Sequence, residues 1–228
     1  MLCASGLALM VSVRRTIDSL NSDVADTETY FADLDFIVME QRPETYEASN
    51  CEAMPAPCAI TVRKFESMEF AAYRNLRLSA LEESPDAFES TLGAEQLRIQ
   101  RAWGSRLDSG CRSGMDLPLI GLVGASAAGL AWGKVDSSDS TVVNVYQMWV
   151  APECRGHGLA RFLLRTIVVW AASLQARSVQ LGVVCGNSPA MRLYTSEGFV
   201  PIGQVTPLRP GSMLMVQSMR LHIPQHSV

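Results

Sequence analysis

Hydrophobic and polar residues follow two different periodicities between Ala59 and Leu221, and these predict an alternation of strands and helices. Apolar side chains recur every three or four positions from Leu159 to about Leu174, which is typical of a helix with one buried face. They alternate with other residues in Ser178–Val184, as in a half-buried strand. Clusters of glycine, proline and polar residues separate such segments, so we expect each segment to form one element.

The segments before Val142 predict a strand, two helices and a hairpin. Ser84-Pro85-Asp86 ends the first helix, and Gly124-Ala125-Ser126 forms the tip of the hairpin. The expected elements are a strand at Ala59–Phe65, helices at Glu69–Glu82 and Ala87–Arg106, and paired strands at Leu117–Val123 and Ala127–Val135.

The segments from Val142 onward predict four more strands and two helices. The shorter helix has clear end signals, with Ser188 as N-cap, Pro189 in the first helical position and Gly198 as C-terminal stop. The expected elements are strands at Val142–Val150, Ser178–Val184, Phe199–Ile202 and Met213–Leu221, and helices at Leu159–Leu174 and Pro189–Glu197. Together they predict an α/β fold of the α+β type, with a mixed, mostly antiparallel twisted sheet and flanking helices.

A glycine-rich loop, Arg155–Ala160, joins the strand at Val142–Val150 to the long helix. Such a loop directs successive backbone N–H groups at one point, where the helix dipole adds partial positive charge, and Arg155 supplies a full charge. This is the chemistry of phosphate binding. The loop is not a P-loop, because Leu159-Ala160 stands where that motif needs Lys-Ser/Thr. It is not a dinucleotide-binding fingerprint either, because Arg161 stands where that motif needs a third small residue and no acid follows about 20 residues later.

The charge pattern also favours a polyanionic ligand. Between Cys154 and Ser196 the chain has five arginines and no acid, although the whole chain has a net charge of -4. Arg161 and Arg165 also fit an ordinary solvated helix face. The net negative charge and the lack of a basic–aromatic tract exclude nucleic acid as the main partner.

The loop and its surroundings resemble the GCN5-related N-acetyltransferase (GNAT) family. The family pattern Arg/Gln-x-x-Gly-x-Gly/Ala is matched by Arg155, Gly158 and Ala160, preceded by Met148-Trp149-Val150 and followed by Asn187, Tyr194 and Gly198-Phe199. The resemblance covers about Ile60–Leu221. It implies that acetyl-CoA lies as co-substrate between two splayed parallel strands, here Val142–Val150 and Ser178–Val184, and that its acetyl group passes to a primary amine in a ternary complex.

The resemblance also implies roles for individual residues. Tyr194 matches the general acid that protonates the leaving thiolate, with a packing role as the alternative. Asn144 stands near the position of a catalytic Glu; it cannot accept the proton of the amine, but it could orient a water that does. The cofactor-binding positions are the backbone of Met148, Trp149 and Val150, the loop residues Arg155, Gly156, His157, Gly158, Leu159 and Ala160, and the side chain of Asn187, which also fits an ordinary turn.

Composition limits the remaining possibilities. The chain has six cysteines, none in a C-x-x-C pair, and only three histidines, so we expect neither a metal site nor a disulfide framework. Cysteines that form no disulfides indicate a reducing cytoplasm. Met1–Val13 is too short to span a bilayer and has the wrong flanks for a signal peptide. A lone Cys185 without a nearby histidine is interpreted as a buried packing residue instead of an acyl-carrying nucleophile. We expect a small-molecule or peptide amine as acceptor and allow for a homodimer.

The expected organisation is an acidic extension at 1–57, a catalytic domain at 58–222 and a tail at 223–228. The extension has ten acids and one base between Asp18 and Pro57, which favours a flexible segment. Two other functional readings stay open. One is an acyl-CoA-binding module with little catalysis, which Asn144 in place of a carboxylate favours. The other is a generic α/β domain whose glycine loop is only a tight turn.

Overall fold

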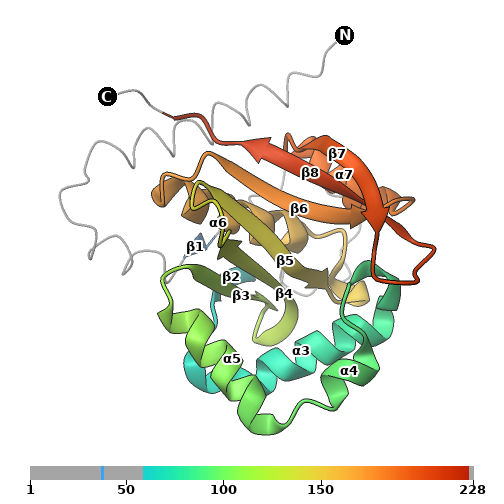
Figure 1. Cartoon of the computed structure of the whole chain (residues 1–228). Coiled ribbons are helices and arrows are strands. Elements are labelled where there is room, and N and C mark those ends of the chain that lie inside the picture. The colour runs from blue at the N-terminus through green and yellow to red at the C-terminus, as the bar shows by residue number, and fades with distance from the viewer. Residues whose placement is uncertain (1–36, 39–58, 226–228) are drawn as a thin grey trace, which may run out of the picture. The chain divides into compact units, whose positions relative to one another are not determined.

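A computed structural model describes residues 37–38 and 59–225 of the 228-residue chain (Figure 1). The predicted acidic extension, apart from the two-residue strand β1 (Ile37–Val38), and the last three residues lie outside the described part. From residue 59 on, the elements follow in the order β2 (Ile60–Lys64), η1 (Ser67–Glu69), α3 (Phe70–Glu83), η2 (Pro85–Ala87), α4 (Leu92–Gln96), α5 (Gln100–Arg112), β3 (Asp116–Val123), β4 (Ser126–Val135), β5 (Val142–Val150), η3 (Pro152–Cys154), α6 (Leu159–Ser173), β6 (Ser178–Val184), α7 (Ser188–Ser196), β7 (Val200–Pro207) and β8 (Met215–His222).

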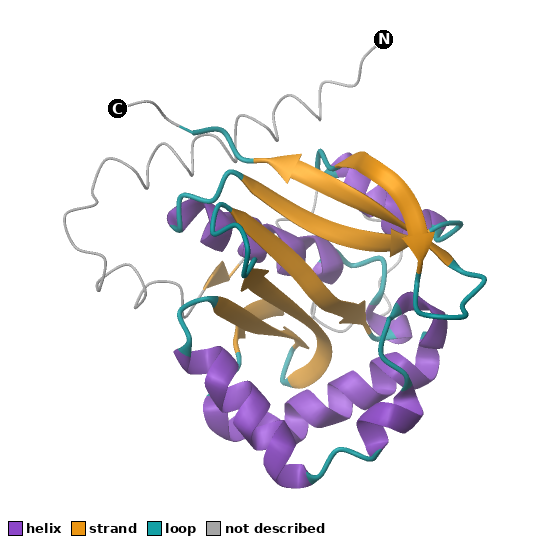
Figure 2. Ribbon diagram, viewed as in Figure 1, coloured by secondary structure: helices purple, strands orange, loops and turns teal. Residues whose placement is uncertain are grey.

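Strands β2 to β8 form one mixed sheet in the order β2-β3-β4-β5-β6-β8-β7. Neighbouring strands are antiparallel except β5 and β6, which run parallel. Helices flank this sheet, as Figure 2 shows. The predicted fold class, a mostly antiparallel sheet with one parallel pair and flanking helices, is therefore confirmed.

Glycines on the central strands let α6 approach the sheet closely. A Cβ at Gly121 would lie 2.7 Å from Cδ1 of Leu159, and one at Gly133 would lie 3.0 Å from Cζ3 of Trp170. Leu159 and Trp170 are almost fully buried in this contact. Because Leu159 is the first residue of α6, this packing also fixes where the glycine-rich loop ends.

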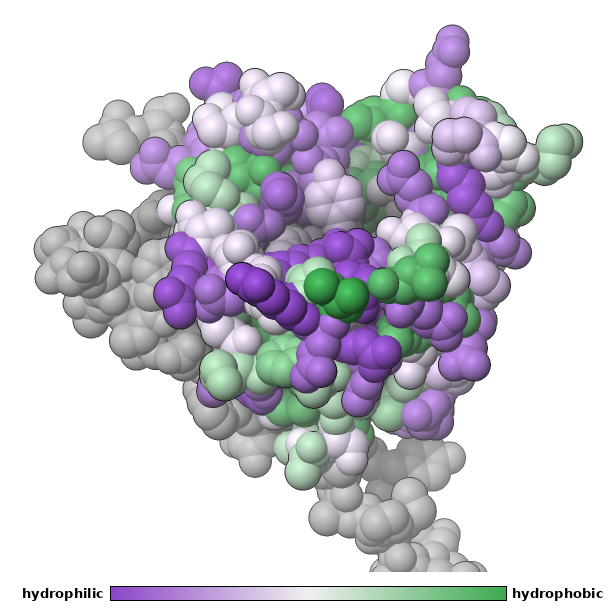
Figure 3. Space-filling view, turned by 60° about the horizontal axis from the view of Figure 1, so that its bottom comes forward, coloured by the Kyte–Doolittle hydropathy of each residue, from purple (hydrophilic) through white to green (hydrophobic). Residues whose placement is uncertain are grey.

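Helices α3 and α5 lie against the sheet through a second apolar cluster, which Phe65, Tyr73, Trp103, Leu107 and Trp132 dominate. The rings of Tyr73 and Trp103 meet edge to face, with centroids 5.5 Å apart. Figure 3 views the molecule from the side that carries these helices, where hydrophilic and hydrophobic patches alternate. The cluster includes Trp132 of β4 and Trp149 of β5, so it packs α3 and α5 against these two strands.

Strand β5 leaves β6 soon after the two strands begin to pair. Their register covers only Val142–Asn144 opposite Ser178–Gln180, although β5 continues to Val150 and β6 to Val184 (Figure 1). The pairing of β5 with β4 also slips after Tyr146, and Gln147 has a φ of 55°, which marks a β-bulge. The bulge bends β5, and the predicted splay of the parallel pair is confirmed.

Three predicted details are wrong. The single helix expected at Ala87–Arg106 is split into α4 and α5, because Ile99 is extended and Phe88 lies outside both helices. The break brings Glu95 of α4 against Arg106 of α5, with Nη1 and Oε1 3.5 Å apart. The N-cap of α7 is Asn187 instead of Ser188. The strand predicted at Phe199–Ile202 extends to Pro207 as β7.

The C-terminal segment continues along the domain beyond residue 222. Ile223 is buried, and its N–H donates to the carbonyl of Arg177 at 2.9 Å. The side-chain amide of Gln225 donates to the carbonyl of Ala176 at 3.0 Å. Residues 223–225, expected in a tail, thus pack on the turn between α6 and β6.

Candidate active site

The loop before α6 presents a row of unpaired backbone donors. Pro152 ends β5, and the two loop glycines then adopt the left-handed region, with φ of 82° at Gly156 and 90° at Gly158. The N–H of Phe162 makes the first helical hydrogen bond, to Gly158. Among the described residues, the N–H groups of 156–161 have no acceptor. Together with the positive end of the α6 dipole, they form a nest suited to a phosphate group.

Arg155 anchors this loop to α3. Its Nε donates to the carbonyl of Val150 at 2.9 Å, and its Nη2 lies 2.6 Å from Oε2 of Glu83. The same oxygen accepts a 2.9 Å hydrogen bond from Nε1 of Trp149 and another from Ser84. These donors, chiefly Arg155, lower the pKa of Glu83 to about 2. The charge of Arg155 is therefore partly compensated, and the carbonyl of Val150 has a partner inside the protein.

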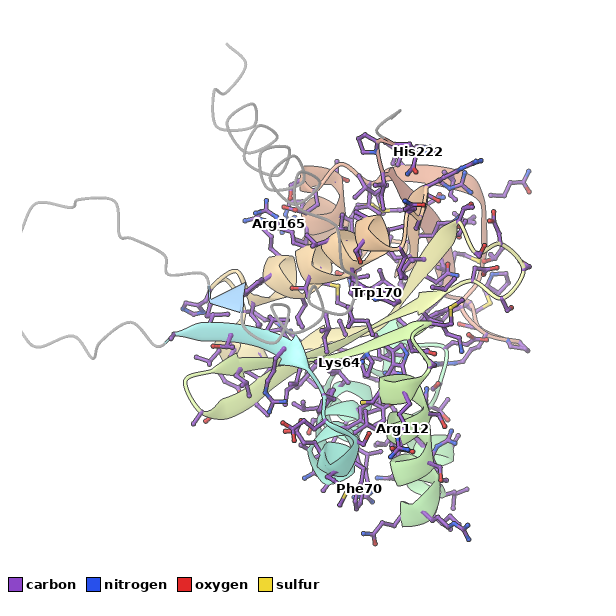
Figure 4. All side chains as sticks on the ribbon, turned by 90° about the vertical axis from the view of Figure 1, so that its left-hand side faces the viewer. Lys64, Phe70, Arg112, Arg165, Trp170 and His222 are labelled. Atoms are coloured by element: carbon purple, nitrogen blue, oxygen red, sulfur yellow. The ribbon has the colours of Figure 1, made fainter. Side chains whose placement is uncertain are left out.

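Two further arginines also have partners. Arg161 and Arg165, one turn apart on α6, each donate through Nε to Glu197 at 2.7 Å, and Glu197 follows α7 directly. Figure 4 shows Arg165 with Trp170 of the same helix, and Trp170 packs against Gly133 of the sheet. The predicted excess of positive charge is thus reduced by Glu197, which lies just outside the arginine-rich segment, and by Glu83 of α3. His157 is exposed.

Tyr194 lies where the splayed strands leave space. Its side chain is 8% exposed, and its hydroxyl is 3.8 Å from Sδ of Met148 on β5. A thioether sulfur is a weak acceptor, so the phenol hydroxyl has no strong partner among the described residues. Burial raises the pKa of Tyr194 to about 12, and the hydroxyl is therefore protonated at neutral pH. The structure thus brings Tyr194 of α7 against Met148 of β5.

Asn144 occupies a different part of β5. It lies in the paired segment, opposite Gln180, and its Nδ2 donates to Oδ2 of Asp136 at 2.9 Å. Hydrogen bonds from Ser138 and Asn144 lower the pKa of Asp136 to about 2. Gln147, the bulge residue, separates Asn144 from Met148, and Tyr73 donates to its Oε1 at 3.0 Å. Asn144 is thus part of a polar cluster at the start of β5.

Asn187 caps α7, since its Oδ1 accepts from the N–H of Ala190 at 3.3 Å. The cap places α7, and hence Tyr194, at the end of β6. The sequence did not predict the ion pairs of Glu83 with Arg155 and of Glu197 with Arg165, because the paired residues are distant in the chain. Gln147 offers a sequence signal for the bulge, because it and Asn144 are the two amide side chains in a mostly apolar strand.

Comparison with known proteins identifies the family. Residues 78–199 match the acetyltransferase (GNAT) family, and the chain therefore belongs to it. The chain is 30% identical over 152 residues to a mycothiol acetyltransferase of Actinosynnema mirum, a match that covers 65% of this chain and 47% of that relative. The chain thus spans about half the length of this relative.

Solved structures show the same fold. A GNAT acetyltransferase from Streptococcus pneumoniae superposes with a TM-score of 0.63 at 22% identity, covering 72% of this chain and 99% of that one. A putative acetyltransferase from Salmonella typhimurium, solved with its cofactor acetyl-CoA, gives 0.62 at 19% identity, covering 74% and 96%. No described helix is long and apolar enough to cross a membrane. In the described part of the chain, no three His, Cys, Asp or Glu side chains are grouped to hold a metal.

Proposed function

We propose that this protein transfers the acetyl group of acetyl-CoA to a primary amine within a ternary complex. The observation that carries the proposal is the juxtaposition of the unpaired N–H groups of 156–161 with the gap that opens between β5 and β6. The first feature suits a pyrophosphate and the second suits an extended thioester arm. Membership of the GNAT family supports the same activity.

The cofactor would follow β5 from the loop into the gap. Its pyrophosphate would accept hydrogen bonds from the loop N–H groups, and its arm would pair with the edge of β5 at Met148–Val150, which has no partner on β6. One backbone N–H of this edge would polarise the thioester carbonyl, and such a preorganised donor is usually a large catalytic contribution. The sulfur would then lie near Tyr194, because this hydroxyl contacts Met148.

Tyr194 would act on the leaving group. The amine attacks the carbonyl carbon, the C–S bond breaks, and the thiolate takes a proton. With a pKa of about 12, Tyr194 holds its proton more tightly than a thiol of ordinary pKa about 8.5. The phenol therefore stabilises the thiolate as a hydrogen-bond donor while the C–S bond breaks. The thiolate then takes up a proton from solvent, which balances the proton that the amine loses to water, and the overall charge is conserved.

The amine would reach the site in its neutral form or lose its proton to water. Glu83 and Asp136, the carboxylates next to Trp149 and Asn144, have pKa values of about 2 and are weak bases. Asn144 would hold the water that receives the proton. The low pKa of these two carboxylates also favours the second candidate, an acyl-CoA-binding module with little catalysis. The free cysteines among the described residues suit a reducing cytoplasm.

Calorimetry and a thiol-release assay separate these functions. We expect acetyl-CoA to bind the full chain and free thiol to appear with at least one member of a panel of amines. Binding without amine-dependent thiol release would select the binding module. No binding of acetyl-CoA would contradict both.

A further inference from the structure

Three buried hydrogen-bond donors without a partner lie in one cluster between α3, α5 and the sheet. Among the described residues, the buried side-chain N and O atoms that lack a hydrogen bond are Nε and Nη1 of Arg77 and Nε1 of Trp103. Arg77 is 3% exposed and Trp103 is 0% exposed. All three atoms are donors, and buried polar groups are nearly always hydrogen-bonded. The cluster therefore calls for an acceptor.

Its position connects the cluster to the proposed active site. Tyr73 precedes Arg77 by one turn of α3, and its ring centroid lies 5.5 Å from that of Trp103. The Tyr73 hydroxyl donates to Oε1 of Gln147, at the bulge of β5 next to Met148. Arg77 thus lies on the side of α3 that faces the strand from which the thioester would be bound.

The negative charge near Arg77 is shared with other arginines, and no acid in the described part of the chain is hydrogen-bonded to its Nε or Nη1. Glu95, at 4% exposure, is the acid of the cluster, but its oxygens accept from Arg98 at 2.9 Å and from Arg106 at 3.5 Å. Three arginines therefore share one carboxylate. Burial lowers the pKa of Arg77 to about 10, so it stays charged at neutral pH. An unpaired buried charge is strongly destabilising, which makes a purely structural role costly.

The segment between η2 and α4 covers the guanidinium. Cζ of Arg77 lies 4.5 Å from the centroid of the Phe88 ring, which stacks on it. The carbonyl of Phe88 accepts from Nη1 of Arg209 at 3.0 Å, which ties this segment to the turn between β7 and β8. A ligand group would reach Arg77 by rotation of the Phe88 side chain, with the backbone held in place.

We infer that Arg77 binds a carboxylate of the acceptor, so that the substrate is an amine that also carries an acid, such as an amino acid or a peptide. This inference rests on the proposed acetyl transfer. The guanidinium offers N–H donors in the planar arrangement that a carboxylate accepts. Tyr73, which precedes Arg77 by one turn of α3, contacts the β5 bulge, so both ends of such a molecule would lie along this face of α3.

Matched acceptors test the inference. The probes are 4-aminobutyrate and 4-aminobutanamide, and an amino acid with its amide, assayed by thiol release with acetyl-CoA. We expect the wild-type chain to prefer the carboxylate member at least tenfold in kcat/KM, and Arg77→Met to reduce this ratio to within about threefold. Arg74→Met, on the same helix, is the control and should keep the preference. Equal use of acids and amides by the wild type would overturn the inference and leave the acetyltransferase proposal standing.

Thermal unfolding gives a readout that does not need turnover. The carboxylate probes should raise the Tm of the wild type, and not that of Arg77→Met, while the amides raise neither. Without a probe, Arg77→Met should unfold at the same or a higher temperature, since it removes an unpaired buried charge. If Arg77→Met has a lower Tm than the wild type and the same selectivity, Arg77 is a structural residue that is hydrogen-bonded to water, and the inference is wrong. A wild type that no carboxylate stabilises would equally overturn the inference.

Discussion

The hydroxyl of Tyr194 lies 3.8 Å from Sδ of Met148, so α7 and β5 meet beside the gap that separates β5 from β6. Neither residue holds the other strongly, because a thioether is a weak acceptor. The position of the phenol is set by its burial and by its contact with Phe199, whose ring centroid lies 6.1 Å away. A hydroxyl that is buried, protonated and weakly bonded is available to a ligand in the gap.

Removal of this hydroxyl tests its part in the reaction. Tyr194→Phe keeps the packed ring, so the fold and the affinity for acetyl-CoA should change little. We expect kcat to fall on the order of 10²–10⁴-fold, the range typical of a side chain that hydrogen-bonds or protonates a reacting group in the transition state. Single-turnover measurement of thiol release isolates the chemical step. A Phe variant with full single-turnover rate would make Tyr194 a packing residue.

The pairing of Glu197 with Arg161 and Arg165 should position Tyr194. Glu197 follows Tyr194 by about one helical turn, and its two carboxylate oxygens accept from Arg161 and Arg165 of α6. These ion pairs therefore hold the end of α7 against α6. Glu197→Gln should lower kcat about three- to thirtyfold with little change in the KM for acetyl-CoA. In a Tyr194→Phe background it should have almost no further effect, as a double-mutant cycle reveals. Additive losses would mean that Glu197 acts elsewhere; Arg192→Gln, on the exposed side of α7, is the control.

The loop glycine Gly158 should be essential for cofactor affinity. Gly158→Asp forces a side chain into a φ of 90° and adds a negative charge beside the unpaired N–H groups. We expect the dissociation constant of acetyl-CoA to rise at least tenfold, about 1.4 kcal/mol. Gly114→Asp, at a φ of 67° with open space around it, carries the same backbone strain far from the loop. Equal affinities of the two variants in calorimetry would contradict the assignment of the loop.

Glu83 should make stability depend on acid pH. Its pKa is lowered from 4.5 to about 2, so the folded state gains stability above about pH 4.5 and loses it as the pH falls toward 2. Glu83→Gln should flatten this part of the Tm-versus-pH curve and loosen Arg155. Glu82→Gln, on an exposed neighbour, should leave the curve unchanged. If the Glu83→Gln variant keeps the wild-type slope of Tm against pH, the loss of stability in acid is caused by other carboxylates.

Local patterns predicted most of the fold because periodicity and end signals act over short distances. Val142–Val150 and Ser178–Val184 match β5 and β6 residue for residue. The break between α4 and α5 was missed, since it depends on Glu95 reaching Arg106 across the bend. In the site, the loop motif is local and Tyr194 follows from the family resemblance. The Arg155–Glu83 pair joins residues 72 positions apart, a contact that only the folded chain defines.

The central claim is that acetyl-CoA and an amine react in this site, and product analysis tests it most directly. The full chain is incubated with acetyl-CoA and a panel of primary amines, and the acetylated amine is quantified by mass spectrometry beside free CoA. The account predicts equal amounts of acetylated amine and CoA, with both reduced in Gly158→Asp at acetyl-CoA concentrations near the wild-type dissociation constant. CoA that accumulates without any acetylated amine, or at the same rate in the absence of an acceptor, would contradict it.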